Sequence, residues 1–188
     1  KDLRELIEYY KNKYSIEKNI PIWLSEFGWS TFEGNGVSFE QQSAYISRAL
    51  TWFLANNSQD SANIEKAYIW CLQNTGFTNS HPEANWGIVD GMKTNKVKAF
   101  TRDVEMAAKD SYVAINNYNY LMKNATIIDS NEDNAETDGY YCYKFYNSDT
   151  DKYILVLWNN EENNIADNYN MYADCACPGH RGQCRIRA

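Results

Sequence analysis

The sequence contains no long hydrophobic run, because each of its apolar stretches has only the length of a strand. A membrane-spanning helix needs roughly 20 consecutive apolar residues, so we expect no membrane span. Positive charge is scarce as well, since the net charge is −7 and three of the arginines crowd the last stretch of the chain. Nucleic acids and anionic membranes both select a basic face, so neither is expected as a partner.

Cysteine is too sparse and too unevenly spread for a disulfide scaffold, because the chain holds five cysteines, an odd number. Cys175, Cys177, His180 and Cys184 are residue types that bind zinc, but Cys-x-Cys does not match the usual Cys-x2–4-Cys pairs. The sequence also lacks a glycine-rich phosphate loop and a dinucleotide fingerprint. We therefore expect no metal site and no cofactor.

Helical and strand-like patterns alternate in the first part of the chain. Apolar residues recur every three or four positions in residues 1–14, which predicts an amphipathic helix. Residues 21–27 form a short apolar run that opens with Pro21, which predicts a buried strand. Ser38 and Gln41 form a capping box that opens a second helix, and residues 66–74 predict a second buried strand. This order is typical of a parallel α/β fold.

The pattern changes in the second part of the chain. Residues 75–95 predict a long loop and residues 97–108 a further helix. From about residue 121 the pattern favours β-structure, with strands at 125–128, 139–146 and 152–158 and a hairpin turn at 147–151. Residues 175–188 show no periodicity, and their simplest interpretation is an irregular tail from a translation-frame error or a non-native join.

The most informative stretch is Ile-Trp-Leu-Ser-Glu-Phe-Gly-Trp at residues 22–29. Ile22, Leu24 and Glu26 share one face of the predicted strand, because side chains alternate with period two. A carboxylate at the C-terminal tip of a buried strand lies where parallel α/β barrels carry their chemistry. The alternative is a glutamate that pairs with a lysine at a strand end.

This stretch resembles the seventh-strand motif of the large clan of retaining glycoside hydrolases built on (β/α)8 barrels. The resemblance implies that Glu26 is the catalytic nucleophile and that a glutamate after strand four is the acid/base. Residues 66–74 would then be strand eight. Glu83 to Asp90 is similar to a following family segment, and residues 97–100 take the place of a lysine-proline-alanine-aromatic run at the start of the last barrel helix, without the proline.

The resemblance also implies a domain organisation. Residues 1–120 would be the C-terminal part of a catalytic TIM barrel, with its last two strands and their helices. Residues 121–174 would be part of an all-β sandwich domain, followed by the irregular tail at 175–188. A complete barrel needs roughly 200 residues or more, so the remaining N-terminal barrel segment is expected in the full-length protein.

Tryptophans are the expected sugar-binding residues, because sugar rings stack on indoles. In the resembled clan an aromatic residue at the end of strand eight forms the floor of the subsite, which implies this role for Trp70; the alternative is a core tryptophan. Trp29 and Trp86 are candidates to line the same cleft, although local packing accounts for them equally well. Trp23 and Trp52 are interpreted as core residues.

The nucleophile needs hydrogen-bond donors to stay ionised, and Asn74 or Tyr68 could supply one to Glu26. Asn74 is therefore predicted as a substrate-side residue. The clan's acid/base follows an asparagine, and we reject both Asn131-Glu132 and Asn160-Glu161 for that role because their contexts are turn-like. We expect the chain to hold the nucleophile without its catalytic partner.

Together these features predict a fragment of a retaining glycoside hydrolase that cleaves β-linked oligo- or polysaccharides by double displacement. The expected partner is a carbohydrate substrate, and the expected location is extracellular. The alternative function is a non-catalytic carbohydrate-binding or interaction module that keeps the aromatic residues without turnover.

Overall fold

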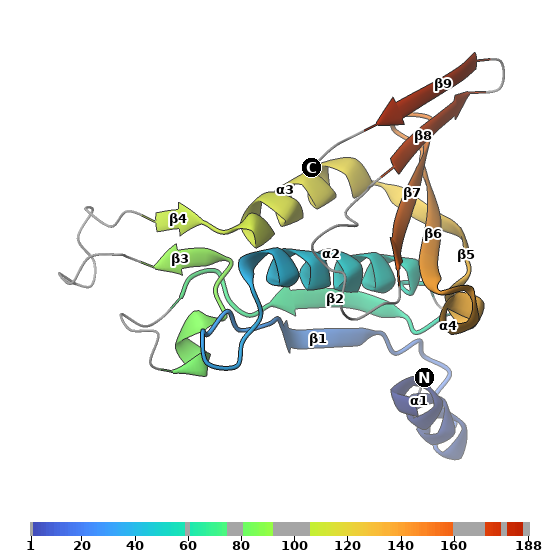
Figure 1. Cartoon of the computed structure of the whole chain (residues 1–188). Coiled ribbons are helices and arrows are strands. Elements are labelled where there is room, and N and C mark those ends of the chain that lie inside the picture. Colours follow the sequence, from blue (N-terminus) through green and yellow to red (C-terminus); the bar gives the residue numbers. More distant parts are fainter. Residues whose placement is uncertain are drawn as a thin grey trace.

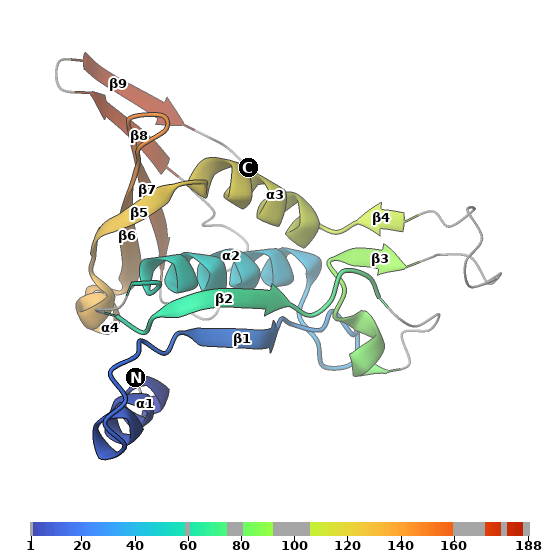
Figure 2. The same ribbon diagram turned by 180° about the vertical axis from the view of Figure 1, so that it is seen from behind.

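The computed structural model describes residues 2–58, 61–74, 81–91, 106–159, 172–177 and 180–185. The protein is a mixed α/β structure, as the sequence predicts at the level of class (Figure 1). Its sheets are a parallel pair, β1-β2, a short antiparallel pair, β3-β4, and an antiparallel sheet in the order β5-β6-β7-β8-β9. The parallel pair lies at one side of the long helix α2, and the antiparallel sheet stands across its end (Figures 1 and 2).

Helix α1 (Asp2–Lys13) confirms the first predicted helix. Its charged side chains pair along the helix, with Glu8 3.2 Å from Arg4 and 3.0 Å from Lys11. Arg4 also donates a hydrogen bond of 2.7 Å to the carbonyl of Ile20, which links the helix to the loop before the first strand. Both views show α1 apart from the other elements, and its apolar side chains are largely exposed.

Helix α2 (Phe39–Ala55) starts where the capping box predicts. The amide of Gln41 donates to Ser38 Oγ at 3.1 Å, and the amide of Ser38 donates to Gln41 Oε1 at 2.9 Å. Two amides that have no partner within the helix are thereby satisfied. Ala44 and Ile46 of this helix are fully or almost fully buried, so α2 is the central element of the fold.

Strands β1 (Ile22–Phe27) and β2 (Ile64–Ile69) are parallel neighbours, as predicted. The prediction of a buried second strand that continues to residue 74 is wrong, because β2 ends at Ile69 and half of its residues are exposed. Leu24 pairs with Ala67 and Phe27 with Ile69, so β1 holds one extra residue between these pairs. Such an irregularity breaks the alternation of side chains. Leu24 is half-buried and Glu26 is exposed. The prediction that Leu24 and Glu26 share one buried face of the strand is therefore wrong.

Trp23 is also placed differently from the prediction of a core residue, since it is 56% exposed. Its indole Nε1 donates a hydrogen bond of 2.8 Å to Glu65, and Lys66 Nζ lies 4.1 Å from the ring centroid. The indole therefore packs along the surface of β2 instead of under a helix. Trp52, by contrast, is half-buried against the main core, as expected.

The helix predicted at 97–108 differs from the structure. Most of it lies outside the described residues, but Met106–Ala108 forms strand β4, which pairs with β3 (Val89–Gly91). The next helix, α3, spans Asp110–Met122 and was not predicted.

The β-rich second part is confirmed by β5 (Ala125–Ser130), β6 (Tyr140–Asn147) and β7 (Lys152–Asn159), which pair antiparallel. Between β5 and β6 lie the short helices η2 (Glu132–Asn134) and α4 (Ala135–Asp138). The predicted turn is held by Asn147 Oδ1, which accepts from the amides of Asp149 and Thr150 at 3.0 and 3.1 Å.

The end of the chain is more regular than expected. Tyr172–Cys177 forms β8 and His180–Arg185 forms β9, and the two strands pair antiparallel at the edge of the same sheet. The prediction of an irregular segment at 175–188 therefore does not hold for 175–177 and 180–185. Alternating apolar and polar residues are absent from these strands, so periodicity could not reveal them.

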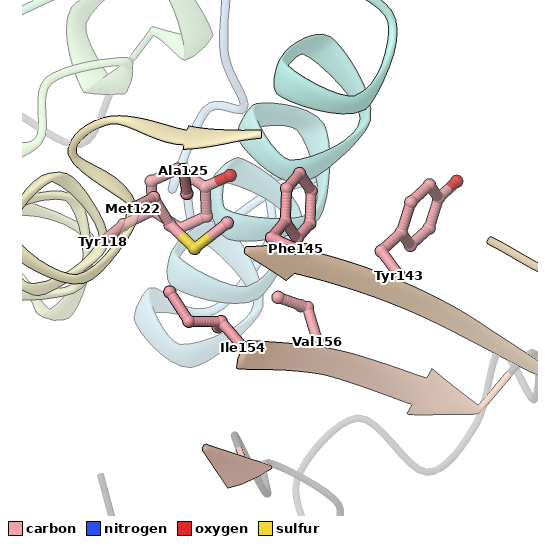
Figure 3. Close-up of a cluster of buried hydrophobic side chains, with 7 residues drawn as sticks. All are labelled: Tyr118, Met122, Ala125, Tyr143, Phe145, Ile154 and Val156. Atoms are coloured by element: carbon pink, nitrogen blue, oxygen red, sulfur yellow. The ribbon is translucent and has the colours of Figure 1, made fainter. Parts of the chain in front are cut away.

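The main core lies between α3 and the antiparallel sheet (Figure 3). It unites buried side chains from α3, β5, β6 and β7, namely Tyr118, Met122, Ala125, Tyr143, Phe145, Ile154 and Val156. Leu50 and Trp52 of α2 pack against this cluster. The core thus spans the boundary predicted at residue 120, and it joins the helical part to the sheet.

Candidate active site

The C-terminal ends of β1 and β2 border an open cavity of about 440 Å³. Its wall contains two carboxylates and three indoles, from Glu26, Glu83, Trp29, Trp70 and Trp86. Phe27, Gly28 and two side chains of α2 also line it, and none of the described residues in its wall is basic. Four of the five predicted site residues therefore meet in one place, and Asn74 is the one that does not line the cavity.

The ends of the two strands approach each other closely at this cavity. The amide of Trp70 donates a hydrogen bond of 2.8 Å to the carbonyl of Phe27. A Cβ at position 28 would lie 2.5 Å from the carbonyl oxygen of Trp70, so only glycine fits there. The peptide bond between Trp70 and Cys71 is cis. Gly28 therefore allows the end of β1, with Glu26, and the loop after it, with Trp29, to reach the same opening as Trp70.

The side chain of Glu26 is exposed, and its carboxylate makes no hydrogen bond or ion pair with the residues that the structure describes. The expectation that Asn74 donates to it is wrong, because the Asn74 amide donates to Asp90 Oδ1 at 3.1 Å. Tyr68 is 50% exposed and likewise makes no hydrogen bond with Glu26. The carboxylate is thus open to an incoming molecule.

The three indoles differ in their surroundings. Trp70 is 44% exposed, which excludes the alternative of a core tryptophan in this structure. Trp29 is half-buried, with its ring centroid 5.4 Å from that of Tyr45 and 6.5 Å from that of Phe27. The Nε1 of Trp86 is buried and has no hydrogen-bond partner among the described residues. Trp70 is therefore the indole that offers most of its ring to a ligand.

Glu83 supplies the second carboxylate of the cavity wall. It lies in the short helix η1 (Pro82–Asn85), which His81 caps by accepting a hydrogen bond from the Glu83 amide at 3.2 Å. The Glu83 side chain is exposed and makes no ion pair with the described residues. The turn thus presents a free carboxylate next to Trp86.

Asn74 lies behind the cavity wall, in a buried polar network. Its Oδ1 accepts from the Gly87 amide at 2.9 Å and from Lys109 Nζ at 3.1 Å. Sequence reasoning placed Asn74 at the active face because it follows the second strand, but the chain turns there and buries the side chain. Asn74 is 9% exposed, so the structure gives it a supporting position.

Lys109 is the residue that sequence reasoning missed. It is 2% exposed, and burial lowers its pKa from the ordinary value to about 8, while Asp90 and Cys71 raise it. Its Nζ lies 5.2 Å from the centroid of the Phe39 ring. No signal in the sequence singles it out, because a buried lysine differs from a surface lysine only in the partners that the fold brings to it.

Other reactive groups do not form a second site in the described part of the chain. Burial raises the pKa of the Cys71 and Cys142 thiols, which keeps both in the unreactive protonated form. No group of three or more potential metal ligands occurs among the described residues. The side chains of Cys175, Cys177, His180 and Cys184 lie outside that description. None of the described helices is long and apolar enough to cross a membrane.

Comparisons of the chain with protein-family models, with curated proteins and with solved structures found no match. The basis for a function is therefore the cavity itself, with its carboxylates and indoles at the ends of two parallel strands. In parallel α/β folds this edge of the sheet is where ligands bind.

Proposed function

We propose that this protein is part of a retaining glycoside hydrolase that acts on β-linked oligo- or polysaccharides. The observation that carries the proposal is the cavity that brings Glu26 together with Trp29, Trp70 and Trp86 at the C-terminal ends of β1 and β2. An exposed carboxylate beside exposed indole surface suits a sugar, because the ring stacks on the indole while the carboxylate faces its polar edge.

In the proposed reaction, Glu26 attacks the anomeric carbon and forms a covalent bond to it, while the glycosidic oxygen leaves and takes a proton from a second carboxyl group. The same group then removes a proton from water, which attacks the anomeric carbon, breaks the ester bond and frees Glu26. Retention requires the two carboxyl groups to stand about 5–5.5 Å apart. No cofactor takes part in either step.

The acid/base is proposed to come from an N-terminal barrel segment of the full-length protein. Glu132 does not serve, because its Oε1 accepts a hydrogen bond of 2.6 Å from Trp52 Nε1 beside the main core. Asn160-Glu161 lies outside the described residues. Glu83 reaches the cavity, but it is on a short exposed turn instead of a strand end.

The parallel arrangement of β1 and β2, with α2 packed beside them, supports the proposal that they are the last two strands of a (β/α)8 barrel. In this proposal α3 is the last barrel helix, and the sheet β5–β9 belongs to an appended β-sandwich. We also propose an extracellular location, because β-linked polysaccharides are too large to cross a cell membrane.

The second candidate is a carbohydrate-binding module without turnover. It is favoured by one observation, since Glu26 receives no hydrogen bond from the described residues. A binding module needs the stacking surface of Trp70 but has no use for a tuned nucleophile.

The substitution Glu26→Gln in the full-length protein tests both candidates. If Glu26 is the nucleophile, hydrolysis of a β-linked substrate falls by roughly 10³-fold or more, because this residue acts only in the transition state. Binding of the same sugar should stay within about threefold, since the amide keeps the shape of the carboxylate.

The matched control is Glu136→Gln, an exposed glutamate on α4, which should leave both hydrolysis and binding unchanged. Hydrolysis that survives Glu26→Gln rules out the nucleophile assignment. Sugar binding by a wild-type protein that never hydrolyses its ligand favours the binding module instead.

A further inference from the structure

Lys109 is a buried lysine that the proposed reaction does not use. Its Nζ donates hydrogen bonds to Thr31 Oγ1 at 2.9 Å and to Asn74 Oδ1 at 3.1 Å, and it lies 3.5 Å from the carbonyl oxygen of Asn85. These three acceptors come from three separate stretches of the chain. A single side chain therefore connects the loop after β1, the turn after β2 and the helix η1.

Each of the three acceptors lies within a few residues of a cavity tryptophan along the chain. The pairs are Thr31 after Trp29, Asn74 after Trp70, and Asn85 before Trp86. The backbone segments that carry the indoles are thus the same segments that meet at the ammonium group. A shift of any one acceptor would move the backbone segment that also carries the tryptophan.

Further hydrogen bonds interlock the same segments. The Thr31 amide donates to the Asn85 carbonyl at 3.0 Å, and the Gly87 amide donates to Asn74 Oδ1 at 2.9 Å. A side chain at Gly87 would collide with the backbone of Asn74, so the two stretches are in direct contact. The polar atoms around Lys109 therefore form one hydrogen-bond network, in which the strength of each bond depends on the others.

Removal of the ammonium group leaves buried acceptors with fewer donors. A buried hydrogen bond to a charged group contributes more than a neutral one, and its loss weakens the local structure. Asp90, whose charge raises the pKa of Lys109, accepts from the side-chain amide of Asn74 at 3.1 Å, which orients Asn74 Oδ1 toward Lys109.

We infer that Lys109 is a positioning residue, whose ammonium group holds the three tryptophan-bearing segments in the arrangement that forms the cavity. The nature of the ligand rests on the proposed function, but the positioning itself does not. Lys109 does not act as a nucleophile or as a Schiff-base lysine, because it is only 2% exposed and stands behind the cavity wall.

The test is amide hydrogen exchange in the full-length protein and in its Lys109→Met variant, which keeps the length of the side chain and removes the charge. We expect exchange of the Thr31 and Gly87 amides to become roughly tenfold faster, because both lie in the network. The amides of β6 and β7 should keep their protection. Lys123→Met, at an exposed lysine that follows α3, is the matched control and should change neither region.

A second, milder variant keeps the test decisive if Lys109→Met fails to fold. Thr31→Val has nearly the same shape and removes one hydroxyl, which accepts from Lys109 Nζ at 2.9 Å and donates to the Asn85 carbonyl at 3.2 Å. Because the ammonium group and its other two acceptors remain, this variant should accelerate the same amides by a smaller factor. For both variants, quenching of tryptophan fluorescence by cellotriose, xylotriose and chitotriose reports the state of the indoles. We expect a several-fold weaker response in the variants than in the wild type and in the Lys123 control.

Three results separate the possibilities. Unchanged exchange at Thr31 and Gly87, or an equal increase in β6 and β7, overturns the positioning role. Faster local exchange with an unchanged response to a sugar that the wild type binds means that the network does not shape the binding site, which also overturns it. A wild type that binds none of the sugars counts against the proposed function, while faster local exchange still supports the positioning of the indoles.

Discussion

At the scale of single residues, Lys109 makes stability depend on pH. Its pKa is lowered to about 8 from the ordinary value of 10.5. Between these values the unfolded chain binds more protons than the folded chain, so the contribution of Lys109 to stability rises with pH from about 8 to 10.5. Below pH 8 both states are protonated and the contribution is flat.

This prediction is checked by urea unfolding of the wild type and of Lys109→Met from pH 7 to 10.5. The free energy of unfolding of the wild type should rise relative to the variant across this window. The raised pKa of Cys71 acts in the opposite sense, because the unfolded thiol ionises first, and Lys109 itself lowers that pKa, so the Cys71 contribution differs between the two proteins. Both proteins are therefore measured with Cys71→Ala, which removes the thiol from the comparison. A constant difference at all pH values contradicts the lowered pKa of Lys109.

The residues that line the cavity were predictable to different degrees. Glu26 was predicted because it lies at the tip of an apolar strand, which can be recognised in the sequence. Trp70 was predicted through the family resemblance, since the predicted second strand continued to residue 74, whereas β2 ends at Ile69. Asn74 was misplaced because the same rule was applied to a residue beyond the end of β2, where the chain has already turned inward. Lys109 was missed because a buried lysine cannot be distinguished from a surface lysine without its partners.

At the scale of secondary-structure elements, the capping box of α2 is a local feature with a measurable effect. Ser38→Ala removes the acceptor for the Gln41 amide, and we expect the protein to lose about 1 kcal/mol of unfolding free energy. Urea unfolding measures the loss. Ser130→Ala, at the exposed end of β5, is the control and should change stability by less than about 0.5 kcal/mol. Equal losses in both variants would contradict a specific capping effect.

Elements with strong periodicity were predicted and weakly patterned ones were not. Helix α2 and the hairpin of β6 and β7 combine a clear period with clear end signals, and both were placed within a few residues. Helix α3 contains many asparagine and tyrosine residues with little contrast between its faces, so its period is faint. Its position depends instead on packing, because Tyr118 and Met122 fill the core under the antiparallel sheet.

At the scale of the whole molecule, the class of fold was predictable but the arrangement of its parts was not. Alternating helices and strands predict a parallel pair, since a helix must connect parallel neighbours. The sequence does not reveal that one core joins α3 to the sheet across the predicted boundary at residue 120, because those contacts bring together distant residues such as Tyr118 and Ile154.

The parallel pair leaves apolar side chains uncovered among the described residues. Trp23 and Tyr68 of the pair are 56% and 50% exposed, and Leu72, which follows the end of β2, is 63% exposed. Neither outer edge of β1 or β2 pairs with another described strand. Open strand edges and exposed apolar surface favour association. We therefore predict that the 188-residue chain alone self-associates, with sedimentation that shifts to larger species as the concentration rises.

Two substitutions distinguish association through this surface from non-specific association through any exposed apolar residue. Leu72→Glu should weaken self-association by roughly tenfold or more, because association that buries a leucine contributes about 1.5–3 kcal/mol. Val113→Glu is the matched control, since Val113 is 51% exposed on α3, away from the parallel pair, and should have little effect. If the chain is instead a monomer with a single sharp thermal transition, the exposed face of β1 and β2 is stable in water, and the proposal that further barrel strands cover it loses its physical support.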